Sequence, residues 1–544
     1  MKVTTTGLID SMILRLRTAR TRLVHYFNKW RLVLALFLVV YFTILVLNID
    51  YALVQWDETQ HFVSGLLLRR GEFQEYLQFS YYPPLFDVIT AVTYAIIGSS
   101  LFSVRLVSLV FGMLSVWAVF EYAYRLYRPK NALISSVLLA SMPGFILVSR
   151  MAFLETVLLF FFSLSLLLFF SWTQTNNQKH LLLSGILVGL GFLAKYQTGI
   201  AGAVMLVSVL FLRKKQIKYN MRKVLVVALI AAVVILPWLF VAYNNYTMEE
   251  VENWVHTVKE GSIERLEYGE RFPLPLFYMV EMTYPYMDLH PISLPIFVLG
   301  VLGLGYWIWK RKPEDKFSLI WFAVVYVVYT FFVSNRNWRY IIPLFPIIAI
   351  AASDLILSTF NKIQKAIQRA KIKVSKPLLQ KLVAVVFSVL MVSAVSYSLQ
   401  NANYWIEKDN IHLPVKEAAQ YAVENSDPNQ TSIVLYASNF FSPDAVYFYL
   451  KTCGSTQRGM EYYPDYAVDS YHPVFNQTQL IEQCKNTSTK YVFLYENANI
   501  TYFQSEWTAH DILEKTVALE NFELEKTFGT SPHRLFLIRF STDT

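Results

Sequence analysis

Two adjacent carboxylates, Asp57 and Glu58, follow the first long apolar stretch of the chain. They stand at the expected edge of a membrane, where charged groups are costly to desolvate. An acid in such a place can accept a proton from a substrate hydroxyl. Taken alone, the pair is explained more simply as solvated loop residues or as the first turn of a helix. The residues around it decide between these interpretations.

Further ionisable residues stand at the corresponding edge of later apolar stretches. Most of them are basic, although the positive-inside rule disfavours basic residues on the outer side of a membrane. Binding of a phosphate would explain them, because arginine donates bidentately to phosphate oxygens. Each could also be an interfacial anchor, an ion pair or a headgroup contact. The set is Arg105, Arg150, Glu155, Lys195, Arg336 and Arg339.

Taken together, these residues predict one kind of chemistry. An acid that accepts a proton, beside cations that stabilise a leaving phosphate, suits glycosyl transfer from a polyprenyl-phosphate sugar. The acids are Asp57, Glu58 and Glu155. A transporter would instead carry charges in the middle of its spans.

The composition predicts a polytopic α-helical membrane protein. Of 544 residues, 55% are hydrophobic and 16% are charged. Such a composition is typical of a chain with many membrane spans. The net charge of +9 does not indicate a nucleic-acid partner, because the basic residues gather in short loops between apolar stretches, as expected of cytoplasmic loops.

Eleven membrane spans are predicted from the apolar stretches. They cover residues 32–49, 103–124, 131–148, 156–172, 181–195, 198–212, 224–243, 291–309, 318–334, 340–357 and 382–399. The stretch 84–98 is short, begins at Pro83-Pro84 and contains Asp87, so we interpret it as a surface-lying or re-entrant helix outside the membrane. The basic loops 213–223, 310–316 and 358–381 are then cytoplasmic.

Three regions follow from this topology. Residues 1–31 form a cytoplasmic basic tail, and residues 32–399 form the transmembrane domain, with exterior loops at 50–102 and 244–290. Residues 400–544 form a small exterior α/β domain with strands at 433–437, 490–495 and 534–540 and helices at 414–423, 443–450 and 511–519. The first apolar stretch lacks a cleavage site and is interpreted as a retained anchor.

Glycosylation sequons and cysteines fit an exterior or lumenal C-terminal region. Five asparagines begin the pattern Asn-X-Ser/Thr, and all five fall outside the membrane in this topology: Asn245, Asn429, Asn476, Asn486 and Asn499. The two cysteines, Cys453 and Cys484, allow one disulfide, which spacing alone does not establish. The membrane could be a plasma membrane or an endoplasmic-reticulum type of membrane.

The pattern resembles the GT-C superfamily of integral-membrane glycosyltransferases, and most of all its protein O-mannosyltransferase and aminoarabinose-transferase-like branch. The resemblance covers roughly residues 30–360. The matching motifs, in chain order, are Trp56-Asp57-Glu58 with His61-Phe62, Tyr82-Pro83-Pro84-Leu85, Arg105-Leu106 with Gly112, Arg150 with Glu155, Gly191 to Lys195, and Arg339-Tyr340 with Pro343 and Pro346. The acid of the fourth motif is usually Asp, whereas this chain has Glu155.

The resemblance implies a dolichyl- or undecaprenyl-phosphate sugar as donor and a hexosyl or pentosyl group as the part transferred. Asp57 is then the expected general base on an acceptor hydroxyl, with Glu58 second, and direct attack inverts the anomeric centre. Lys195, Arg336 and Arg339 are expected to bind the donor phosphate. Arg105, Arg150 and Tyr82 would orient the site, and Glu155 would bind the acceptor or influence the pKa of Asp57.

The cofactor, the acceptor and the function class stay open at this stage. No His or Cys cluster has zinc-like spacing, although carboxylates could hold a divalent cation. The acceptor could be a protein, a lipid or a glycan. The C-terminal region does not resemble the sugar-binding repeats of eukaryotic protein mannosyltransferases, which puts a protein acceptor in doubt. A polytopic transporter, or a receptor or scaffold with an exterior binding domain, is the alternative to the enzyme.

Overall fold

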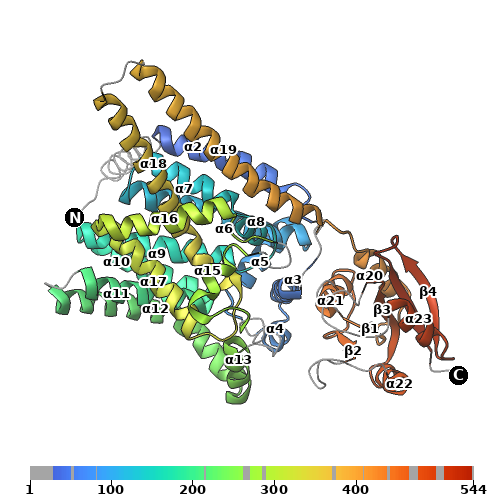
Figure 1. Ribbon diagram of the computed structural model, residues 1–544. Helices are drawn as coiled ribbons and strands as arrows, with labels where there is room; N and C mark the ends of the chain where they lie inside the picture. The colour runs from blue at the N-terminus through green and yellow to red at the C-terminus, as the bar shows by residue number, and fades with distance from the viewer. Residues whose placement is uncertain are drawn as a thin grey trace, which may run out of the picture.

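The structure is a computed structural model with a helical part and a smaller part built on a β-sheet (Figure 1). It describes residues 28–50, 54, 56–80, 82–212, 216–260, 270–284, 289–370, 375–408, 410–437, 441–464, 476–497 and 508–541. The predicted basic tail up to residue 27 and the sequon at Asn499 lie outside the described residues.

The helical part runs from α2 to α19. Its elements are α2 (Lys29–Val46), α3 (Trp56–Arg70), α4 (Phe73–Phe79), α5 (Leu85–Ile97), α6 (Leu101–Leu126), α7 (Pro129–Ser141), α8 (Pro143–Arg150), α9 (Glu155–Thr175), α10 (Gln178–Ala194), η1 (Tyr196–Gly199), α11 (Ile200–Leu212), α12 (Ile217–Asn245), α13 (Met248–Glu260), η3 (Leu274–Leu276), α15 (Phe277–Glu281), α16 (Leu294–Lys310), α17 (Pro313–Phe331), η4 (Trp338–Leu344), α18 (Phe345–Arg369) and α19 (Lys376–Lys408).

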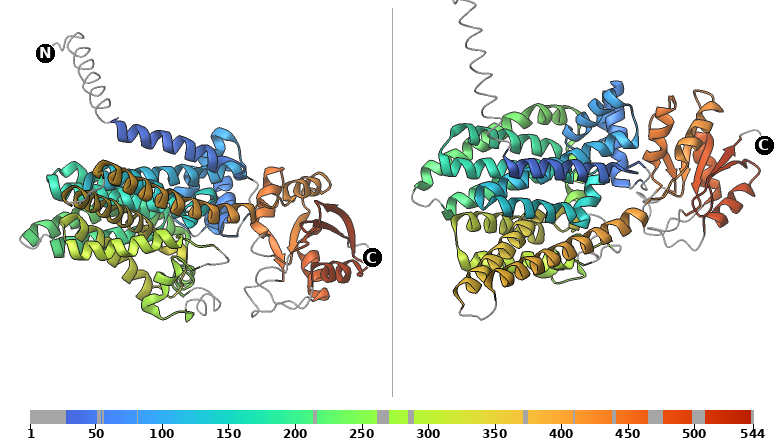
Figure 2. Two further views of the ribbon diagram at one scale, coloured as in Figure 1. Left: turned by 45° about the horizontal axis from the view of Figure 1, so that its top comes forward. Right: turned by 90° about the horizontal axis from the view of Figure 1, so that it is seen from above.

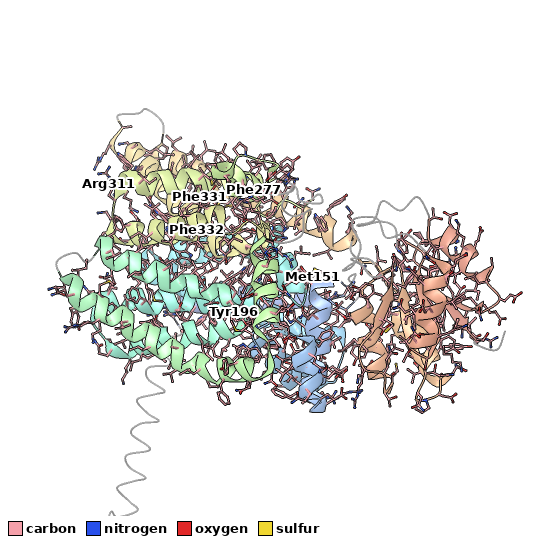
Figure 3. The ribbon with its side chains drawn as sticks, turned by 90° about the horizontal axis from the view of Figure 1, so that it is seen from below. Met151, Tyr196, Phe277, Arg311, Phe331 and Phe332 are labelled. Carbon is pink, nitrogen blue, oxygen red and sulfur yellow. The ribbon has the colours of Figure 1, made fainter. Side chains whose placement is uncertain are left out.

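The long helices lie side by side and have two distinct ends (Figure 2). We call the end near α3 and the β-sheet the sheet end, and the opposite end the far end. Met151 lies near α3 at the sheet end, whereas Arg311 lies at the far end (Figure 3). The C-terminal end of α8 therefore lies at the sheet end, and the C-terminal end of α16 lies at the far end.

Six of the described helices are long and apolar enough to cross a membrane, and a bent pair, α7 with α8, would make seven. Large apolar side chains are exposed along α2, α12 and α19, as expected of surfaces that face lipid. The other predicted spans correspond to α10, η1 with α11, α16 and α17, which are shorter or carry more charge. The count of eleven spans stays a prediction.

Several helices differ in their bounds from the predicted spans and loops. The span expected at 131–148 is interrupted at Met142, where Pro143 begins a new helix and the axis bends by 69°. The loop 50–102 contains α3 and α4 as well as the expected helix α5, and the loop 244–290 contains α13 and α15. Two basic loops are shorter than predicted, because α12 begins at Ile217 and α18 continues to Arg369.

The part after α19 is a mixed five-stranded sheet with the order β2-β1-β3-β5-β4. The strands β1 (Thr431–Leu435), β2 (Glu461–Tyr463) and β3 (Thr489–Tyr495) are parallel, while β5 (Leu535–Phe540) pairs antiparallel with β3 and with β4 (Phe522–Phe528). The helices are α20 (Val415–Glu424), α21 (Pro443–Thr452), α22 (Gln477–Asn486) and α23 (Ala509–Val517). The sequence prediction lacked β2, β4 and α22.

Helices cover both faces of this sheet, because side chains alternate along each buried strand. Val492 and Leu494 of β3 pack in a core with Ile512 of α23. Tyr491 and Phe493 of the same strand pack on the other face with residues of α20 and α21, such as Ala418. Cys453 and Cys484 are both free thiols, so the disulfide that spacing allowed is not formed.

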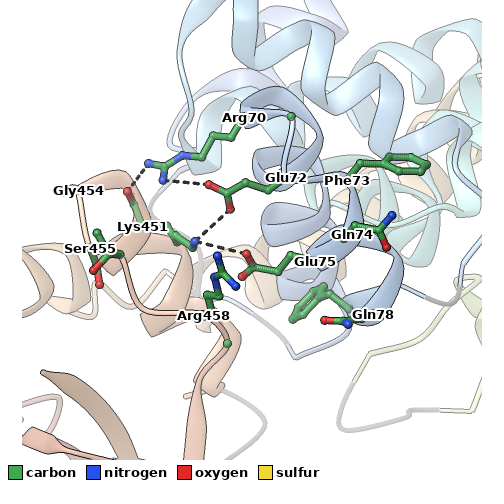
Figure 4. A pocket seen from close by; sticks show the side chains of 14 residues that line it. Arg70, Glu72, Phe73, Gln74, Glu75, Gln78, Lys451, Gly454, Ser455 and Arg458 are labelled. Atoms are coloured by element: carbon green, nitrogen blue, oxygen red, sulfur yellow. Dashed lines mark hydrogen bonds and ion pairs between the residues drawn. The ribbon is translucent and has the colours of Figure 1, made fainter. Parts of the chain in front are cut away.

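Helix α21 connects the sheet to the helical part through charged contacts. Lys451 Nζ lies 3.0 Å from a carboxylate oxygen of Glu72 and 3.6 Å from one of Glu75 (Figure 4). The Tyr447 hydroxyl donates to Glu75, and Arg70 donates to the backbone carbonyl of Lys451. These contacts border a cavity of about 810 Å³ between α4 and the loop after α21.

Candidate active site at the sheet end

Helix α3 presents the two adjacent acids in its first turn, and it gives them different environments. Acids are favoured in the first turn because the N-terminal end of a helix is electropositive. The Asp57 side chain is 43% exposed, whereas that of Glu58 is fully buried. Of the two carboxylates, only Asp57 can therefore meet a substrate without rearrangement of the protein.

Glu58 forms a buried ion pair with Arg105 of α6. Nε and Nη2 of the guanidinium both donate to the carboxylate, with Nε 3.3 Å from Oε2. Glu58 also accepts a hydrogen bond of 2.8 Å from the backbone N–H of Ala152, and Arg105 donates to the Ile49 carbonyl at 2.8 Å. This pair joins α3, α6 and the segment before α9, and the orienting role of Arg105 stays a prediction.

Arg339 contacts the exposed acid Asp57. Its position is set by Asn337, whose side chain caps η4 by accepting a hydrogen bond of 3.0 Å from the Arg339 N–H. The guanidinium also stacks on Phe153, with its central carbon 4.6 Å from the ring centroid. A cation predicted to bind phosphate thus lies directly beside the predicted base.

Glu155 and Lys195 form the third acid–base pair, with 2.7 Å between Oε1 and Nζ. Glu155 is the first residue of α9, and Lys195 directly follows α10. Gly191 allows the two helices to approach, because a Cβ there would lie 2.8 Å from the Cβ of Phe161 and would also collide with Thr198. The Lys195 ammonium lies 5.8 Å from the ring centroid of Tyr340.

Arg150 caps the end of α2 instead of pairing with one of these acids. Its guanidinium donates to the backbone carbonyls of Leu45 at 2.6 Å, Leu47 at 3.1 Å and Asn48 at 3.2 Å. Those carbonyls would otherwise lack partners at the helix end. Arg150 thus holds the segment that precedes α3, and its predicted role in orienting the site stays untested.

Arg336 and Tyr82 lie at the borders of this site. The Arg336 guanidinium lies 5.8 Å from the ring centroid of Phe277, and none of the three ion pairs includes it. Tyr82 packs on His61, with 5.3 Å between the ring centroids.

A buried pair formed by His61 and Asp87 was missed as a contact. His61 Nδ1 lies 2.9 Å from Asp87 Oδ1, and both side chains are buried between α3 and α5. Burial raises the pKa of the Asp87 carboxyl above its ordinary value, and the charge of His61 opposes that rise. Two features of the sequence could have indicated this pair. His61 lies one helical turn after Asp57, and Asp87 is the one acid in an otherwise apolar stretch.

The described acids do not form a metal site. Among the residues that the structure describes, no group of three or more His, Cys, Asp or Glu side chains could hold an ion together. Asp57, Glu58 and Glu155 each contact a basic side chain instead. In the described part of the chain these acids are thus neutralised by basic side chains, and the divalent cation stays an untested prediction of the sequence.

Solved structures with the GT-C fold are similar to this chain over most of its length. ArnT from Cupriavidus metallidurans superposes with a TM-score of 0.63 at 13% identity, covering 94% of this chain and 97% of ArnT. That protein has also been solved bound to undecaprenyl phosphate. An oligosaccharyltransferase from Archaeoglobus fulgidus superposes with a TM-score of 0.56 at 14% identity, covering 87% of this chain and 70% of that one. The chain has the GT-C fold and is a multi-pass membrane protein.

Sequence comparison gives a consistent result. Residues 82–240 match the family described as dolichyl-phosphate-mannose-protein mannosyltransferase. The lipid A galacturonosyltransferase RgtD of Rhizobium johnstonii is 27% identical over 56% of this chain, and an uncharacterized protein of Aquifex aeolicus is 25% identical over 61%. These matches span 57% and 64% of the two relatives. Together the comparisons show that the chain has the GT-C fold and is similar in sequence to glycosyltransferases.

Proposed function

We propose that the protein transfers a glycosyl group from a polyprenyl-phosphate sugar to an acceptor hydroxyl, with Asp57 as the general base. The contact between Asp57 and Arg339 carries this proposal, because it places an accessible proton acceptor beside a cation suited to phosphate. The names of the relatives support a lipid-phosphate donor, since they include a dolichyl-phosphate-mannose family and a protein solved with undecaprenyl phosphate.

The reaction is a single displacement. Asp57 accepts the proton of the acceptor hydroxyl while the hydroxyl oxygen forms a bond to the anomeric carbon. The bond between that carbon and the phosphate oxygen breaks, and the polyprenyl phosphate leaves with the negative charge. Arg339, Lys195 and Arg336 stabilise that charge, and the anomeric configuration inverts. No covalent intermediate is formed, so one base is sufficient.

The buried acids support the site in this proposal. Glu58 is fully buried against Arg105, so it holds α3 against α6 while Asp57 acts as the base. Glu155 neutralises Lys195 until donor phosphate arrives, and it borders the acceptor position.

We also propose that the sheet end faces the exterior or the lumen and that the N-terminus is cytoplasmic. The described sequon asparagines support this orientation, since Asn429, Asn476 and Asn486 lie in or beside the sheet-bearing part. Asn245 ends α12, and the hydroxyl of the next residue, Tyr246, bonds to Ser80 after α4.

The proposal is tested by sugar transfer in detergent-solubilised protein. The donors are radiolabelled dolichyl-phosphate mannose and a panel of undecaprenyl-phosphate sugars, and Asp57→Asn is compared with Asp427→Asn, an exposed acid of the sheet-bearing part. Removal of a general base lowers the rate by about 10²–10⁴-fold, and the control should retain the parental rate. Parental turnover by folded Asp57→Asn would remove the base assignment. Failure of the parent with every donor would reject the donor class.

A further inference from the structure

A second charged cavity lies at the far end, remote from the candidate active site. It has a volume of about 460 Å³ and opens between the end of α6 and the ends of α16 and α18. Five basic side chains line it, against the carboxylates of Glu314 and Asp354: Arg128, Lys310, Lys312, Lys362 and Lys365. Such an excess of positive charge in one hollow attracts an anion.

The floor of this far-end cavity is held by hydrogen bonds to the Asp354 carboxylate. The Asp354 carboxylate accepts hydrogen bonds from Trp307 Nε1 at 3.0 Å, Lys310 Nζ at 2.7 Å and Asn131 Nδ2 at 3.3 Å. Lys310 also lies 3.6 Å from the carboxylate of Asp315. Asp354 and Asp315 therefore balance the charge of Lys310, and the remaining basic residues supply the excess.

The rim of the cavity carries that excess. None of Arg128, Lys312, Lys362 and Lys365 forms an ion pair with a carboxylate within the described part of the chain. Lys362 is held by aromatic rings, with its ammonium 5.0 Å from the Tyr306 centroid and 5.1 Å from the Trp309 centroid. The ring contacts leave N–H donors of Lys362 available for oxygen acceptors.

Exposed apolar residues place this cavity at the boundary of the membrane. Ile308 and Trp309, just before Lys310, are 59% and 73% exposed. Tryptophan is enriched where a span meets the headgroup layer. Lipid chains that cover Ile308 and Trp309 would hold a headgroup phosphate at the depth of the basic rim.

We propose that the far-end cavity binds the phosphate-bearing headgroup of an anionic phospholipid in the adjacent leaflet. The basic rim binds the phosphate oxygens, while the acyl chains lie along the exposed face of α16. The site is at the opposite end of the helices from Asp57, so it is separate from the donor site and does not depend on the proposed function. A soluble phosphate compound shares the headgroup chemistry but would not use the apolar face.

The test compares full-length protein in nanodiscs of phosphatidylcholine alone with protein in nanodiscs that also contain phosphatidylglycerol. Native mass spectrometry counts the phosphatidylglycerol molecules retained after release. The test variant is Lys362→Gln with Lys365→Gln, and the control is Lys218→Gln with Lys381→Gln, which removes the same charge from exposed lysines that do not line the cavity. A basic residue near an anionic surface contributes about fivefold in affinity, so the test variant should retain phosphatidylglycerol about thirtyfold more weakly.

The control variant distinguishes lipid binding in the cavity from general electrostatic attraction of anionic lipid to the basic far end. Full retention by the control and loss by the test variant, with equal thermal stability, is the expected result. Equal loss in both variants, or no preference for phosphatidylglycerol in the parent, would overturn the proposal. Inorganic phosphate is added as a competitor, and displacement of the lipid by millimolar phosphate would assign the site to a soluble phosphate instead.

Discussion

The carboxylate of Asp57 meets the guanidinium of Arg339 although 282 positions separate them in the chain. The first residue comes from the initial turn of α3 and the second from η4. Because Arg339 is mostly buried and Asp57 is not, an incoming anion can reach this pair from the side of the acid. A donor phosphate that takes over Arg339 would leave Asp57 without its counter-ion and strengthen it as a base.

Substitution of Arg339 should therefore act mainly on the donor. Arg339→Gln should raise the KM for the polyprenyl-phosphate sugar and lower kcat/KM by about 10²-fold, because a charge-assisted contact to the leaving phosphate is lost. Arg339→Lys keeps the charge without the planar fork and should lie between the parent and Arg339→Gln. Steady-state kinetics with varied donor measures this, with Arg539→Gln on β5 as the control. An unchanged donor KM together with a reduced kcat would contradict donor binding by Arg339.

Substitution in the buried pair of Glu58 and Arg105 should lower the stability of the protein more directly than its rate of glycosyl transfer. Glu58→Gln leaves the Arg105 charge without its partner and should destabilise the protein by about 3 kcal/mol. Thermal unfolding in detergent measures this loss. Adding Arg105→Met to the same chain removes the orphaned charge and should recover part of it, so the two losses should not add. Additive losses would show that the side chains are not coupled.

Two glycines of α16 offer a matched comparison of packing against α18. A Cβ at Gly303 would collide with the backbone carbonyl of Ala351, whereas a Cβ at Gly305 would meet nothing within 4 Å. Gly303→Ala should lower the free energy of unfolding by about 2 kcal/mol through overpacking. Gly305→Ala should raise it by up to about 1 kcal/mol, because alanine is the better helix former. Equal melting temperatures for the two variants would refute the close approach of these helices.

Acid should weaken the sheet-bearing part through Glu496. Hydrogen bonds from Arg534 lower the pKa of Glu496 to about 2, with Oε1 2.6 Å from Nη2. The stabilisation is complete above the ordinary pKa of a glutamate, about 4.3, and is lost as the pH falls through about 2. The full shift corresponds to about 3 kcal/mol, and partial exposure of Arg534 reduces this to about 2 kcal/mol. Tryptophan fluorescence during acid titration should show a flatter transition for Glu496→Gln than for the parent.

The sequence predicted which ionisable residues share one end of the helices but not which of them pair. Each of Asp57, Arg105, Lys195 and Arg339 borders an apolar stretch, and the alternating direction of the helices brings such borders to the same end. The pairing of Glu155 with Lys195 depends on the close approach at Gly191, which no local pattern encodes. Arg150 shows the limit most clearly, since its partners are backbone carbonyls of another helix.

Other differences had local signals. Pro143-Gly144 marks the bend between α7 and α8, because proline cannot continue the helix that precedes it. The edge strand β4 reads Phe-Glu-Leu-Glu-Lys-Thr-Phe, and its charges conceal an alternating pattern that is typical of a strand exposed on one side. The sequence analysis did not predict helix α3, because the segment is not very hydrophobic. Its acidic first turn and its last-turn residues Arg69 and Arg70 are nevertheless typical signals of a helix start and end.

The contact between Arg150 and the carbonyls of α2 has a consequence for biosynthesis. The donor lies 105 positions after the first of its acceptors, so α2 leaves the ribosome long before its capping residue is made. The first helix of the described residues must wait in the membrane without this cap on its C-terminal carbonyls until α8 arrives. Helix α2 therefore reaches its final hydrogen bonding only after α8 has been made, and truncations between the two should leave α2 poorly anchored to the nascent bundle.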